Sequence, residues 1–104
     1  TSAAPWSVRG RFGAVLESTS AVLIMGGDGN PRSNDVWGTI DGGVTWGELT
    51  SAAPWSARYG FGTATTPTGA VLVMGGSALS SVEVNDIWTT DGGVMWTEVT
   101  SAAP

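Results

Sequence analysis

Apolar residues along the chain fall into short runs that are separated by glycine, proline and polar clusters. Residues 21–25 and 70–74 are the clearest of these runs, and each is followed directly by a Gly-Gly pair. A strand without polar positions has to be covered on both faces, which happens when its sheet lies between other sheets. The pattern therefore predicts two buried strands that end at glycine pairs.

Weaker signals predict three more strands around each of these runs, and no segment has helical periodicity. The first strand is expected over about residues 10–17, and again over about residues 60–66. The third is expected to begin near residue 34 or 85, and the fourth near residue 45 or 95. Asp-Gly-Gly lies between the third and fourth strands, where glycine supplies the positive φ of a hairpin turn. Each half of the chain is therefore predicted to form one antiparallel sheet.

An internal repeat sets the domain organisation. The sequence TSAAP begins at Thr1, Thr50 and Thr100, and residues 1–27 match residues 50–76 without a gap. The two units are thus related along most of their length. We predict one repeat over residues 1–49, a second over residues 50–99 and the truncated start of a third over residues 100–104.

A sheet that is apolar on both faces and repeats at this period is the unit of a β-propeller, whose blades pack face to face around an axis. The expected fold is all-β, with two four-stranded antiparallel blades. Two blades cannot close a ring, and alone they would leave two apolar faces in water. We therefore predict that identical chains associate head to tail into a cyclic homo-oligomer with an even number of blades. A trimer with six blades is favoured, and a tetramer with eight comes next.

Both units resemble the kelch repeat. An Arg and a Phe-Gly pair precede the apolar strand, a glycine pair follows it, and the sequence NDVW or NDIW precedes a second tryptophan by about nine residues. The resemblance implies that the glycine pairs end the second strand and that the later tryptophan packs between blades. The residues concerned are Gly26, Gly27, Gly75, Gly76, Trp37, Trp88, Trp46 and Trp96.

Residues 39–46 and 89–96 are also similar to the Asp-box of sialidase-type propellers, a hairpin of the form Ser/Thr-x-Asp-x-Gly-x-x-Trp. This resemblance implies a structural turn in which the aspartate accepts hydrogen bonds from backbone N–H groups of its own turn. The matching residues are Thr39, Asp41, Gly43 and Trp46 in the first unit and Thr89, Asp91, Gly93 and Trp96 in the second.

Composition narrows the range of partners. The chain has nine carboxylates, four arginines and no lysine, and its formal net charge is −5. Nucleic-acid binding needs clustered positive charge, so no such partner is expected. The absence of cysteine excludes a disulfide framework and a thiolate metal site. The longest apolar run is far shorter than the roughly 20 residues that span a bilayer, and no basic-then-apolar leader begins the sequence, so a soluble chain without a membrane partner is expected.

Catalysis is not expected, and no cofactor or metal is implied. Without His or Cys, acid–base and nucleophilic chemistry has few candidates. Asp41 and Asp91 are better explained as turn residues than as facing carboxylates of a glycosidase. Tyr59 beside Arg58 has no counterpart in the first unit, which argues against sialidase chemistry. The oxygen-rich residues 28–35 are interpreted as a turn and a strand start, because a Ca²⁺ loop would have no equivalent in the second unit.

Arg9 and Arg58 have both a structural and a binding interpretation. Each precedes the innermost strand of its unit, so a closed ring would present them near one mouth of its channel, where they could bind an anion or an acidic partner. The favoured interpretation is an ion pair with Asp35 or Asp86 of a neighbouring blade, since partly buried arginine is usually paired.

Two functions from different classes follow. The favoured one is a non-enzymatic, self-assembling scaffold or interaction module, a fragment, natural or engineered, of a longer repeat array. The alternative is a carbohydrate- or peptide-binding propeller whose mouth is formed by Trp6, Trp55 and the loops at residues 28–33 and 77–84. These loops differ in length between the units, as surface loops do. Packing is the favoured role of the two tryptophans, and a sugar-binding platform is the alternative.

Overall fold

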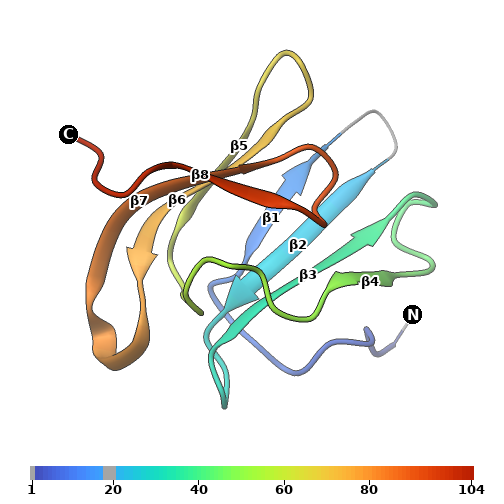
Figure 1. Cartoon of the computed structure of the whole chain (residues 1–104). Coiled ribbons are helices and arrows are strands. Elements are labelled where there is room, and N and C mark those ends of the chain that lie inside the picture. Colours follow the sequence, from blue (N-terminus) through green and yellow to red (C-terminus); the bar gives the residue numbers. More distant parts are fainter. Residues whose placement is uncertain (1, 18–20) are drawn as a thin grey trace.

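The computed structural model describes residues 2–17 and 21–104, which form two four-stranded antiparallel sheets (Figure 1). The strands of each sheet are hydrogen-bonded in chain order. In the described residues the only helical element is a single 3-10 turn, η1 (Leu79–Ser81), and the all-β prediction is confirmed. The first sheet contains β1 (Gly13–Leu16), β2 (Val22–Gly27), β3 (Ser33–Thr39) and β4 (Gly47–Thr50); the second contains β5 (Gly62–Thr65), β6 (Val71–Ser77), β7 (Glu83–Thr90) and β8 (Trp96–Thr100).

The first strand of each sheet is shorter than its sequence pattern predicts. β1 begins at Gly13 because Arg11 has a φ of 50°, which interrupts the extended backbone. The residues before it still reach the second strand, since Gly10 pairs with Asp28 through an isolated bridge. In the second sheet Tyr59 pairs with Ser77 in the same way. Each first strand therefore has a short continuation beside the loop that follows the glycine pair.

The glycine pairs lie at the ends of β2 and β6, where the backbone leaves the regular ladder. Gly26 and Gly27 have φ values of 61° and 116°, and Gly75 and Gly76 have values of 63° and 97°. Residues with a Cβ rarely adopt these angles. The register of both sheets shifts at these positions, which is the signature of a β-bulge.

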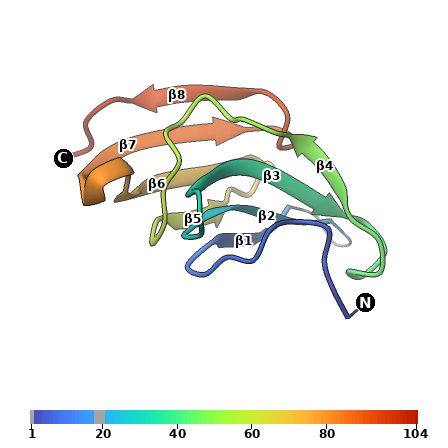
Figure 2. The same ribbon diagram turned by 90° about the horizontal axis from the view of Figure 1, so that it is seen from below.

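The hydrophobic core lies between the two sheets. The first sheet contributes Leu23, Met25 and Val36, which are 2%, 0% and 0% exposed. Val71, Val73 and Trp96 of the second sheet belong to the same buried cluster, together with Trp55 and Ala53 of the connecting segment. β1 and β5 are in contact, so the first strands of the two sheets lie side by side (Figure 2).

Candidate functional site

The two sheets are related by the repeat but do not present the same face to each other. Leu23 and Met25 of β2 point into the core, whereas their equivalents Leu72 and Met74 of β6 lie on the opposite face from the buried Val71 and Val73. Each sheet therefore has a face of one type turned to its neighbour and a face of the other type turned outward. The contact is head to tail, as between successive members of a stack.

The outward face of the second sheet is called here the trailing face; it consists of Ala64, Leu72, Met74, Ile87 and Val99. All are apolar, and their equivalents in the first sheet are Val15, Leu23, Met25, Val36 and Leu49, which take part in the core. Leu72, Met74 and Ile87 are half-buried and Val99 is 58% exposed. The trailing face thus repeats the composition of a core surface, but no second sheet of the described residues covers it.

The outward face of the first sheet is called the leading face; it consists of Trp6, Phe12, Ala14, Leu16, Trp37 and Trp46. Phe12 is 41% exposed and Leu16 is 57% exposed. In the second sheet the equivalents of Trp6 and Trp46 are Trp55 and Trp96, which are 1% and 9% exposed because they face the first sheet. The leading face is therefore also a core-type surface without its cover.

Ring packing against glycine fixes how the two sheets meet. A Cβ atom at Gly13 would lie 2.5 Å from Cε2 of Phe61, and a Cβ atom at Gly26 would lie 2.9 Å from Cε1 of the same ring. On the trailing face the equivalent glycines are Gly62 and Gly75. The three atoms nearest to a Cβ at Gly62 all belong to Met74 of its own sheet, and a Cβ at Gly75 would meet only the carbonyl oxygen of Val84 within 4 Å. Gly62 and Gly75 thus repeat on the trailing face the glycine surface that Phe61 covers on the first sheet, but no phenylalanine ring lies against them.

Arg9 and Arg58 are each at the centre of a hydrogen-bond network within one sheet. Arg58 donates to Oδ1 and Oδ2 of Asp86 at 2.6 and 2.9 Å and to the carbonyl of Gly75 at 2.9 Å. Arg9 makes the equivalent bonds to Asp35 and Gly26. Asp35 and Asp86 are the partners that the sequence predicts, but the expectation that each pair joins neighbouring blades is wrong, because the aspartate lies on the third strand of the same sheet. The two guanidinium side chains are 2% and 0% exposed.

These networks shift the titration of both aspartates. The hydrogen bond from Arg58 lowers the pKa of Asp86, and the indole N–H of Trp88 adds to this effect. Burial raises the pKa of Asp35, but the hydrogen bonds from Arg9 and Trp37 outweigh it, so the net shift is downward. Both carboxylates are therefore held in the charged form.

The hairpin between β3 and β4 is closed by side chains of the expected box. The backbone N–H of Thr45 donates to Asp41 at 2.9 Å, and the N–H of Gly43 donates to the hydroxyl of Thr39 at 3.0 Å. The hydroxyl and backbone N–H of Thr45 and the hydroxyl of Thr39 lower the pKa of Asp41 to about 2. The indole of Trp46 donates to the carbonyl of Gly43.

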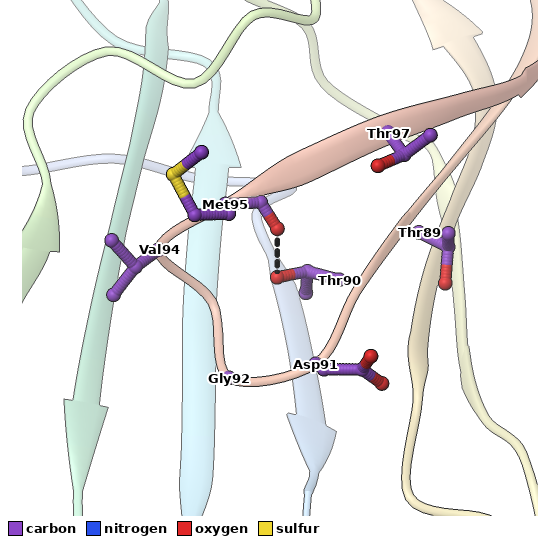
Figure 3. A pocket seen from close by; sticks show the side chains of 7 residues that line it. All are labelled: Thr89, Thr90, Asp91, Gly92, Val94, Met95 and Thr97. Atoms are coloured by element: carbon purple, nitrogen blue, oxygen red, sulfur yellow. Dashed lines mark hydrogen bonds between the residues drawn. The ribbon is translucent and has the colours of Figure 1, made fainter.

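The hairpin between β7 and β8 uses a different threonine from the one expected. Thr90 accepts a hydrogen bond from the N–H of Gly93 at 2.9 Å and donates to the carbonyl of Met95 at 2.6 Å (Figure 3). The register places Thr90 opposite Val71, as Thr39 is opposite Val22. Thr89 precedes it and lines a surface hollow with the exposed Asp91. The sequence motif is offset because this hairpin has one residue fewer between tryptophan and aspartate.

Two asparagines that the sequence analysis did not single out hold the segments that follow each sheet. Asn34 and Asn85 are the first residues of NDVW and NDIW, and each binds the second alanine of a TSAAP sequence through its side chain and backbone. Their identical position in both repeats was the sequence signal that could have identified them.

Comparison with protein-family models and with curated proteins finds no match to this chain. Among the described residues, no three or more Asp and Glu side chains gather in a group that could hold a metal ion. The same residues include no helix of the length and apolarity needed to cross a membrane.

Proposed function

We propose that the chain is a non-enzymatic pair of propeller blades that assembles with copies of itself into a closed ring and serves as a structural scaffold or interaction module. One observation carries this proposal. The contact between the two sheets buries Leu23, Met25 and Val36, and the same chain carries their equivalents on the trailing face and the equivalents of their covering residues on the leading face. Other copies supply the missing cover, one at the leading face and one at the trailing face.

The expected interface is heterologous, because a leading face of one copy meets a trailing face of another. Burial of apolar surface drives this contact, and it is worth roughly 25 cal/mol for each Å² removed from water. The inter-copy contact differs from the internal one in detail. Within the chain, the hydroxyl groups of Thr63 and Thr65 donate hydrogen bonds to carbonyls of β1. The side chains of their equivalents, Ala14 and Leu16, have no donor and would add apolar contact between copies instead.

Ring closure favours six blades from three copies, with eight blades from four copies as the next candidate. Sedimentation velocity from nanomolar to micromolar concentration tests this directly. We expect a discrete species of about three times the 10.6 kDa of one chain. A folded species that stays at the mass of one chain over the whole range overturns the proposal.

A complementation experiment separates head-to-tail closure from other forms of association. Leu16→Glu places a charge on the leading face, and Ile87→Glu places one on the trailing face. Each variant alone is expected to be monomeric, because every contact in the ring needs one face of each kind. An equimolar mixture retains one intact face from each variant, so it should form a dimer and nothing larger. Rings formed by either variant alone contradict the heterologous interface.

A further inference from the structure

Trp55 shows how one end of the interface is filled. The N–H of Ala53 donates to the carbonyl of Asn34 at 2.8 Å, and the side-chain amide of Asn34 donates to the carbonyls of Ala53 at 3.1 Å and Trp55 at 3.4 Å. The connecting chain is thereby held at the start of β3. The indole of Trp55 is 1% exposed, in the same buried cluster as Met25 and Val36.

The hydrogen bonds between asparagine and alanine are repeated near the start of β7. The N–H of Ala103 donates to the carbonyl of Asn85 at 2.8 Å, and the side-chain amide of Asn85 donates to the carbonyl of Ala103 at 3.0 Å. Ala103 belongs to the third TSAAP sequence. Beside it lies a mainly apolar cavity of about 300 Å³, lined by Met74, Val84 and Ile87 together with Ala103.

We infer that this cavity is the seat of the Trp6 indole of a second copy. The inference rests on the proposed self-assembly and names the residue that anchors it. Met74 and Ile87 are the equivalents of Met25 and Val36, which share a cluster with Trp55.

Trp6 is held on the leading face in the pose that this seat requires. Its ring packs edge-on against Trp46, with centroids 4.7 Å apart and an interplanar angle of 88°. Trp55 packs against Trp96 in the same way, at 5.6 Å and 85°. Each tryptophan therefore packs on the hairpin tryptophan of the sheet that follows it in the chain, and Trp55 also lies against the sheet that precedes it.

Two segments of identical sequence can form the hydrogen bonds to Asn85. Within the chain, Ala103 binds Asn85. Ala4 of the second copy must also approach Asn85 when Trp6 enters the cavity, because Ala4-Pro5-Trp6 matches Ala53-Pro54-Trp55. Both cannot bind Asn85 at once. Residues 101–104 therefore act as an internal competitor that weakens assembly, and the N-terminal segment of the second copy displaces them.

Two changes test this in opposite directions, with dissociation constants measured by sedimentation velocity. Removal of residues 101–104 is expected to tighten assembly at least tenfold, and Trp6→Ala is expected to weaken it at least tenfold. Leu79→Glu is the matched surface control and should leave assembly unchanged, since Leu79 is 65% exposed on η1, away from both faces. If Trp6→Ala does not fold, Val84→Trp decides, because it fills the cavity from its own side and should weaken assembly equally.

The outcomes separate this inference from the proposed function. Rings of unchanged affinity after removal of residues 101–104, or with the folded tryptophan or cavity variant, overturn the inference and leave self-assembly intact. If neither the full chain nor the shortened one assembles, self-assembly is overturned. The seat is then judged with a synthetic peptide of residues 1–8 on the shortened chain. Binding that is lost when Trp6 of the peptide becomes Ala sustains the seat, and absence of binding overturns it.

Discussion

The guanidinium of Arg58 forms a two-point pair with the carboxylate of Asp86, with N–O distances of 2.6 and 2.9 Å. The same guanidinium donates to the carbonyl of Gly75. One side chain thus joins the loop before β5 to the bulge of β6 and to the third strand of the sheet. Because the pair is repeated by Arg9 and Asp35, the network is an intrinsic part of each sheet and independent of the neighbouring one.

Asp86→Ala is expected to destabilise the chain by about 3–5 kcal/mol, because it leaves the fully buried charge of Arg58 without its counter-charge. Urea unfolding at fixed protein concentration measures the change. Asp28→Ala is the control, since Asp28 pairs with Arg32 at 3.5 Å near the surface, where such pairs are worth about 0–1 kcal/mol. Equal effects of the two substitutions would contradict the structural role of the Arg58 network.

Acid is expected to weaken the fold through the same aspartates. Asp35 and Asp86 have pKa values below their ordinary value of 3.8, so their contribution to stability is fully present above that pH. It is lost as the pH falls below 3.8 and through the lower pKa values of the folded state. Urea unfolding between pH 7 and pH 2 measures this loss. The Asp86→Ala variant should show a shallower loss, and an equally steep one would assign the acid sensitivity to other groups.

The repeat and the apolar runs were sufficient to predict two four-stranded antiparallel sheets, because strand and turn signals are local properties of the sequence. Two features depended on three-dimensional register. The aspartate partners of Arg9 and Arg58 lie on the third strand of the same sheet, which the spacing alone does not distinguish from a neighbouring one. Thr90 replaces Thr89 in the second hairpin because strand pairing, and not distance from Asp91, decides which hydroxyl faces the turn.

Two equivalent glycines are expected to separate folding from assembly. Gly13→Ala should destabilise the chain by about 1–3 kcal/mol, the usual range for overpacking, because its Cβ would overlap the ring of Phe61. Gly62→Ala should leave the unfolding of a single chain nearly unchanged. It should weaken assembly, because in the proposed ring its Cβ would overlap the ring of Phe12 of another copy. Unfolding below the assembly concentration and sedimentation above it give the two readouts.

The tryptophans of the two hairpins provide the final prediction. Trp96 is 9% exposed between the sheets, so Trp96→Ala should cost about 3–5 kcal/mol in the unfolding of a single chain. Trp46 is only half-buried on the leading face, where it contacts Trp6, so Trp46→Ala should cost less there but weaken assembly strongly. Both indoles donate to the carbonyl of a hairpin glycine, at 3.1 and 3.2 Å, so loss of this bond is common to the two variants. The difference between the two losses of unfolding free energy therefore measures how much the packing of one sheet on the other stabilises a tryptophan. If Trp46→Ala assembles like the unchanged chain, the leading face is not the surface through which copies meet.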